Sequence, residues 1–86
     1  MKIKDGFIIR EAAGSYVVMN LGNEINFNSL ITLNETGALI WNYINDGFNE
    51  DEIAAKIAEE YRISFETALT DVKAFINKMR EADVLE

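Results

Sequence analysis

The sequence has no cysteine, no histidine and no proline among its 86 residues. The absence of cysteine excludes disulfides, thiolate nucleophiles and iron–sulfur sites within this chain. The additional absence of histidine excludes Cys/His zinc sites and the Ser–His and Cys–His catalytic pairs. The chain also lacks low-complexity stretches, internal repeats and flexible linkers. Its length is that of one domain, and we expect residues 1–86 to fold as a single unit.

Basic residues are scarce, with 8 Lys and Arg against 15 Asp and Glu, for a net charge of −7. This balance argues against binding to nucleic acid and to anionic membrane surfaces, because both depend on clusters of Lys and Arg. The N-terminal segment MKIKDGF lacks the apolar region of a signal peptide, and no stretch approaches the length of a membrane span. We therefore expect a cytoplasmic protein.

The first 33 residues are predicted to form strands. Two β-rich runs, residues 7–11 and 16–19, flank Ala13-Gly14-Ser15, which indicates a hairpin turn. A third extended segment is predicted within residues 26–33. A lone hairpin is marginally stable in water, so this small sheet must pack against other elements.

Residues 34–86 are predicted to form three helices, each with a capping residue at its start. Asn34 begins the first helix, which ends at Asp46-Gly47. Asn49 begins the second, with Glu52 placed to complete a capping box, and Ser64 begins the third, which runs to about Ala82. Apolar residues at helical spacing give each helix an inward face. These faces are formed by Ala38, Leu39, Trp41, Tyr43 and Ile44; by Ile53, Ala54, Ile57, Ala58 and Tyr61; and by Ala68, Leu69, Val72, Phe75, Ile76 and Met79.

This order predicts an α+β fold, a three-stranded antiparallel sheet followed by three helices (β-β-β-α-α-α). Chemical motifs are absent. The five glycines are scattered and form no phosphate-binding loop. The acid-rich run at residues 45–52 looks like a calcium loop. Aligning such a loop on Gly47, however, places the flanking residues Ile44 and Ile53 at positions that need oxygen ligands. We expect no enzyme activity, no metal and no cofactor.

The run LITLNETGALIW, from Leu30 to Trp41, is more specific. It resembles the Leu-Asn-Glu-Thr-(Gly/Ala)-Ala…Trp signature of the PqqD family, named for a protein of pyrroloquinoline quinone biosynthesis. The resemblance covers essentially the whole chain and is clearest over residues 25–86. Further segments resemble the family in register: Asp51-Glu52-Ile53-Ala54, Glu59-Glu60-Tyr61, Asp71-Val72-Lys73-Ala74-Phe75-Ile76 and Val84-Leu85-Glu86.

The resemblance implies a recognition element for ribosomally synthesised and post-translationally modified peptides (a RiPP recognition element). Such domains have a winged helix-turn-helix-like fold. They bind the leader segment of a precursor peptide and present it to a modifying enzyme, often a radical S-adenosylmethionine (SAM) protein. The resemblance further implies that the leader joins the edge of the sheet as an added strand, in a groove between the third strand and the third helix.

Strand addition is physically reasonable, because an edge strand has unpaired N–H and C=O groups that a peptide can satisfy. For the strand side of the binding site we predict Asn28, Leu30, Ile31, Thr32 and Leu33. For the helix side we predict apolar contacts from Val72, Ile76 and Met79, with Lys73, Asn77 and Arg80 beside them. Lys73 and Arg80 would pair with acidic leader residues.

Other interpretations of the same residues stay open. Val72, Ile76 and Met79 are also typical of a core face, and Lys73 and Arg80 of a solvated helix face. Trp41 is interpreted as a core anchor. The alternative function is a winged-helix DNA-binding regulator, although the third helix mixes acidic residues with its basic ones. A third possibility is a module that associates with itself; we expect a monomer or weak homodimer.

Overall fold

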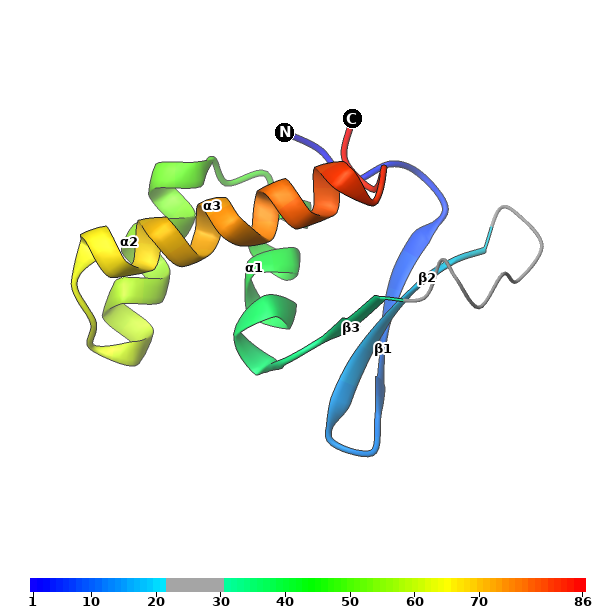
Figure 1. The fold of residues 1–86 in the computed structure, drawn as a ribbon, viewed down its shortest axis with the longest axis horizontal. Helices are drawn as coiled ribbons and strands as arrows, with labels where there is room; N and C mark the ends of the chain where they lie inside the picture. The colour runs from blue at the N-terminus through cyan, green and yellow to red at the C-terminus, as the bar shows by residue number, and fades with distance from the viewer. Residues whose placement is uncertain (22–30) are drawn as a thin grey trace.

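Three strands precede three helices in the computed structural model, which describes residues 1–21 and 31–86. The strands form one antiparallel sheet in the order β1-β2-β3, beside the helices (Figure 1). The predicted α+β class and element order are thus confirmed, with a helical arrangement that suits a winged helix-turn-helix-like fold. The elements are β1 (Phe7–Ala12), β2 (Ser15–Asn20), β3 (Ile31–Leu33), α1 (Glu35–Asn45), α2 (Glu50–Tyr61) and α3 (Phe65–Glu81).

The β1–β2 hairpin turns through two residues. Ala12 pairs with Ser15, and the intervening Ala13 and Gly14 both have positive φ, 51° and 82°. Positive φ at both central residues defines a type I′ turn, whose twist matches that of the flanking strands. Ser15, which was predicted to lie in the turn, is instead the first residue of β2.

The third strand is short in the described part of the chain. β3 pairs with β2 through Tyr16↔Leu33, Val17↔Thr32 and Val18↔Ile31. Residues 26–30 of the predicted extended segment lie outside the described residues, so the structure confirms residues 31–33 as strand. Within the described residues β3 has a sheet partner on one side only, which makes it an edge strand.

All three predicted helix starts are confirmed by side-chain caps. The Asn34 side chain accepts a hydrogen bond from Gly37 N at 2.8 Å, and Ser64 Oγ accepts one from Thr67 N at 3.1 Å. At α2 the capping box is complete, because Asn49 and Glu52 each accept from the other's backbone N–H. These bonds satisfy amides that have no partner inside the helix.

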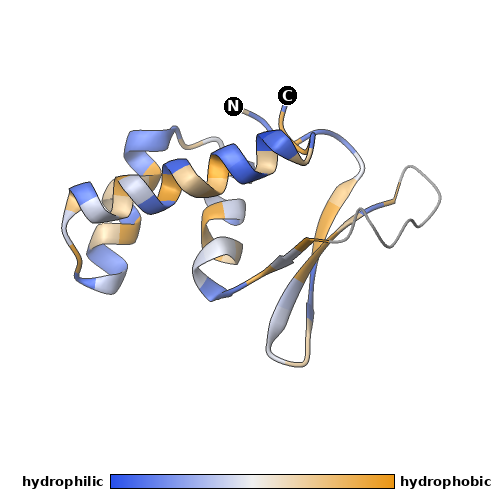
Figure 2. Ribbon diagram, in the orientation of Figure 1, coloured by the Kyte–Doolittle hydropathy of each residue, from blue (hydrophilic) through white to orange (hydrophobic). Residues whose placement is uncertain are grey.

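The core lies mainly among the three helices, and Val18 and Leu33 extend it to the sheet. Its largest fully buried side chains are Trp41, Ile40, Ile53, Ile57, Ile76, Met79, Val18, Val72 and Val84. Trp41 is 2 % exposed, which confirms its interpretation as a core anchor. Figure 2 shows apolar and polar positions alternating along α3, as expected for a helix with one face in the core. The predicted stripe of α2 ends early, because Tyr61 is 37 % exposed.

The two ends of the chain are tied together (Figure 1). Ile3 forms an isolated antiparallel bridge with Leu85, Lys4 N donates to Val84 O at 2.8 Å, and Glu86 N donates to Lys2 O at 2.8 Å. Lys4 also forms an ion pair with Asp83. Among the described residues, no helix has the length and apolar character that crossing a membrane requires.

Candidate functional site

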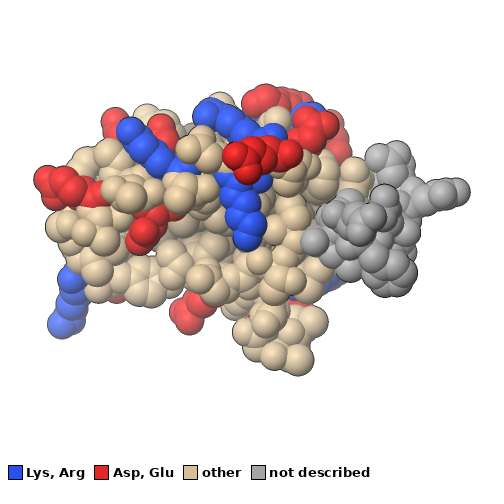
Figure 3. Space-filling view, viewed as in Figure 1, with Lys and Arg blue, Asp and Glu red and all other residues tan. Residues whose placement is uncertain are grey.

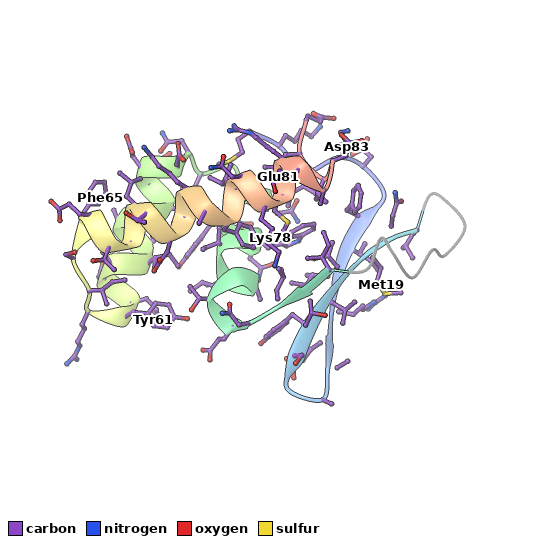
Figure 4. All side chains as sticks on the ribbon, in the orientation of Figure 1. Met19, Tyr61, Phe65, Lys78, Glu81 and Asp83 are labelled. Atoms are coloured by element: carbon purple, nitrogen blue, oxygen red, sulfur yellow. The ribbon has the colours of Figure 1, made fainter. Side chains whose placement is uncertain are left out.

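An open groove runs between the edge strand β3 and helix α3, with the start of α1 at its base. Residues from both walls and from the base line it, together with one residue of the hairpin. They are Ser15, Thr32, Leu33, Asn34, Thr36, Gly37, Ile40, Asp71, Ala74, Phe75 and Lys78. Lys78 is labelled in Figure 4, where it extends from the side of α3 that faces α1 and β3.

The base of the groove depends on a close approach between α1 and α3. A Cβ atom added at Gly37 would lie 3.3 Å from Cε2 of Phe75, 3.3 Å from Cβ of Leu33 and 3.3 Å from Oδ1 of Asn34. The two carbon–carbon distances, to Phe75 and Leu33, are shorter than an ordinary van der Waals contact between carbon atoms. Glycine at position 37 therefore lets the Phe75 ring settle against the first turn of α1, where it forms an apolar floor.

Helix α3 has three distinct faces. Val72, Ile76 and Met79 are 0 %, 1 % and 0 % exposed, so they belong to the core and not to a binding surface. The groove wall is formed instead by a different stripe, Asp71, Ala74, Phe75 and Lys78, of which none is among the residues predicted for the site.

The polar residues predicted for the site lie elsewhere on α3. Lys73, Asn77 and Arg80 are exposed but do not line the groove. At about 100° per residue, they lie on the side of α3 away from Asp71 and Lys78. The structure therefore does not bring Lys73, Asn77 and Arg80 together with the β3 edge.

On the strand side, Thr32 and Leu33 line the groove, Leu33 with a buried side chain and Thr32 with an exposed one. Ile31 is half-buried and packs against the core. The predicted contacts Asn28 and Leu30 lie outside the described residues. The strand side of the prediction is thus placed at the groove for two of its five residues.

The pairing pattern shows which β3 residue faces the free edge. Leu21 N donates to Gly6 O at 2.8 Å, so residue 21 and alternate β2 residues before it direct their backbone groups toward β1. Tyr16 and Val18 consequently direct theirs toward β3, to their partners Leu33 and Ile31. Thr32, which lies between these partners, therefore presents both its N–H and its C=O to the free edge, beside the groove.

Charge in and around the groove is mixed. Asp71 and Lys78 are both exposed, and on the face shown in Figure 3 the Lys and Arg side chains are interspersed with Asp and Glu. On this face the described residues form no basic stripe of the kind that DNA-binding helices present. Near the hairpin, the Glu11 carboxylate opposite Tyr16 raises the pKa of the Tyr16 phenol above its ordinary value of 10.0, and desolvation adds to the rise.

Groups of side chains suited to a metal ion do not occur in the described part of the chain. Among the described residues that line the groove, the ionisable groups are one carboxylate and one ammonium, at opposite ends of its helical wall. This arrangement offers shape, backbone hydrogen bonds and two charges to a ligand, which are features of a binding surface.

Comparisons with known proteins agree with this fold over nearly the whole chain. It is similar to the solved structure "TbiB1 in Complex with the TbiA(beta) Leader Peptide" (TM-score 0.82, 24 % identity, covering 100 % of this chain and 95 % of that one). It is also similar to "Lasso peptide synthetase B1 complexed with the leader peptide" (TM-score 0.78, 20 % identity, covering 98 % and 93 %). No curated protein matches at a significant level. The family model described as "Coenzyme PQQ synthesis protein D (PqqD)" matches residues 15–85, and the chain therefore belongs to the PqqD family.

Proposed function

We propose that this protein is a non-catalytic adaptor that binds the leader segment of a ribosomally synthesised precursor peptide in the groove between β3 and α3. The leader would add to the free edge of β3 as a fourth, extended strand. The observation that supports this most directly is the outward-facing backbone of Thr32 beside a groove with an apolar floor. Main-chain hydrogen bonds would supply affinity, and the groove side chains would supply selectivity.

Two further findings support the proposal. The chain belongs to the PqqD family, and both similar structures were solved with a leader peptide bound. The adaptor would then present the bound peptide to a modifying enzyme. The resemblance of the sequence to its family implies that this enzyme is of the radical SAM class. The absence of cysteine and histidine from the chain fits a division of labour in which the partner enzyme supplies the chemistry.

The proposal is tested by a backbone-amide NMR titration of the labelled protein with the leader of a precursor peptide encoded beside its gene. We expect micromolar or tighter affinity, about −8 kcal/mol or more favourable. Chemical shifts should move most at residues 31–33 and 71–78 and least on β1. Shifts confined to other surfaces would contradict strand addition to β3.

A backbone substitution sharpens the test. Thr32→Pro removes the N–H that faces the free edge, without removing a hydrogen bond to β2. We expect it to weaken leader binding by tenfold or more. Glu11→Pro is the matched control, because Glu11 is also in an edge strand, β1, and the same alternation turns its N–H outward. Equal affinity of the Thr32→Pro and Glu11→Pro variants would argue against the proposed mode.

A further inference from the structure

The α3 wall of the groove has opposite charges at its two ends. Asp71 and Lys78 both line the groove and are both exposed. They are separated by seven residues, which is about 10 Å along a helix axis. Ala74 and Phe75 lie between them on the same wall.

Both charges are free to meet a ligand. In the described part of the chain, neither Asp71 nor Lys78 forms an ion pair or a side-chain hydrogen bond. Lys4 and Asp83, in contrast, are paired with each other. Two unpartnered charges of opposite sign therefore face one groove around its apolar floor. They make one end of the groove negative and the other end positive.

The topology determines which end of an added strand would lie near each charge. In Figure 1, β3 runs toward the start of α1, and α3, from its yellow end to its red end, runs in the opposite direction. Antiparallel pairing is the pattern of the whole sheet and the more stable kind per residue. A segment added antiparallel to β3 would therefore run in the same sense as α3, with its N-terminal part near Asp71 and its C-terminal part near Lys78.

The spacing of strand residues then specifies a pattern. Alternate side chains of an extended segment point the same way, and positions two and four apart are separated by about 7 Å and 13 Å. The span between positions four apart is slightly longer than the distance between Asp71 and Lys78 along the helix axis. The long Lys78 side chain can reach across this difference. We propose that the groove selects segments with a basic, an apolar and an acidic residue at alternate positions, in that order from N- to C-terminus. This inference rests on the proposed leader-binding function.

Two synthetic peptides of identical composition test the order. One has Lys-Thr-Leu-Thr-Glu at its centre, and the other has Glu-Thr-Leu-Thr-Lys, with the same uncharged flanks and blocked ends. We expect the first to bind about tenfold more tightly by fluorescence anisotropy, because reversal turns two weak attractions into two repulsions. The ratio should shrink at 0.5 M salt, where charges are screened over a few ångströms.

Exchanging the protein charges provides the decisive variant. The double substitution Asp71→Lys, Lys78→Asp should reverse the preference between the two peptides. Lys73→Asp is the matched control, because it makes the same change as Lys78→Asp on the far side of α3 and should leave the ratio unchanged. Equal binding of the two peptides, no binding of either, or a preference that survives the exchange would overturn the inference.

These outcomes are separable from a failure of the proposed function. The leader encoded beside the gene, tested with the Thr32→Pro and Glu11→Pro variants, reports on strand addition regardless of charge order. Loss of leader binding in Thr32→Pro together with indifference to the charge exchange would keep the adaptor function and reject the charge rule. No leader binding by the well-folded unmodified protein would reject the adaptor function itself.

Discussion

Gly37 and Phe75 approach each other so closely that a Cβ at position 37 would lie 3.3 Å from Cε2 of the ring. We predict that Gly37→Val destabilises the protein by about 2 kcal/mol, in the range of an overpacked core. The branched side chain must displace either the Phe75 ring or the Asn34 cap. Urea unfolding measures the change in stability.

The smaller Gly37→Ala substitution is the control. Alanine gains about 1 kcal/mol of helix propensity over glycine, which offsets the cost of a small shift of its neighbours. We expect its stability to stay within about 1 kcal/mol of the original. A Gly37→Val variant as stable as Gly37→Ala would show that the Phe75 floor is yielding and that the close approach does not define the groove.

The hairpin turn offers a stabilising substitution. Ala13 has a φ of 51°, a conformation that costs an ordinary residue about 1 kcal/mol and that asparagine tolerates better. Ala13→Asn creates the Asn-Gly pair preferred in type I′ turns and should raise the free energy of unfolding by about 1 kcal/mol. Gly14→Ala should lower it by a similar amount, although nothing lies within 4 Å of the added methyl group. Urea unfolding of both variants tests whether the effect is conformational.

Lys56 is predicted to stabilise the contact between α2 and the end of α1. Its Nζ lies 4.5 Å from the centroid of the Phe48 ring and 5.7 Å from that of Tyr43. The two rings also meet edge to face. Lys56→Gln should cost about 0.5–1 kcal/mol of stability, whereas Lys56→Arg should keep most of it. Thermal unfolding of the Lys56→Gln and Lys56→Arg variants measures the two losses of stability. Equal losses in both variants would contradict the prediction.

The Tyr16 phenol gives a prediction for alkaline pH. Because Glu11 raises its folded-state pKa above the ordinary 10.0, the neutral phenol contributes its full stability below pH 10.0 and loses it as pH rises through the folded pKa. Glu11→Gln should move the Tyr16 titration back toward 10.0. Ultraviolet absorbance of the phenolate measures this in a Tyr43→Phe, Tyr61→Phe background, where Tyr16 is the one remaining tyrosine. An unchanged titration would remove Glu11 as the cause.

The helix starts could be predicted from the sequence because capping is local. Asn34, Asn49 and Ser64 each bond to amides three residues away, and no distant element is needed to form those contacts. The hairpin was predicted with its turn one residue too long, since Ala13 in a left-handed conformation is an uncommon choice.

The groove wall of α3 could not be predicted in the same way. A search for the most apolar stripe finds Val72, Ile76 and Met79, and such a stripe is driven into the core by the same hydrophobicity that makes it visible. The stripe that lines the groove mixes Asp71 and Lys78 with Ala74 and Phe75, so its hydropathy resembles that of an ordinary helix flank. Its position became evident only once the packing of α3 against α1 and its place beside β3 were known.

The bridge between Ile3 and Leu85 brings the entry and exit of the domain to one place. A domain with this geometry can be inserted into a surface loop of another protein while the host chain continues almost where it left off. It can also be circularly permuted, with a short linker joining the present ends and new ends opened at Asp46-Gly47, a turn whose residues do not line the groove. The domain, with its groove intact, could therefore be inserted into a surface loop of a chosen enzyme.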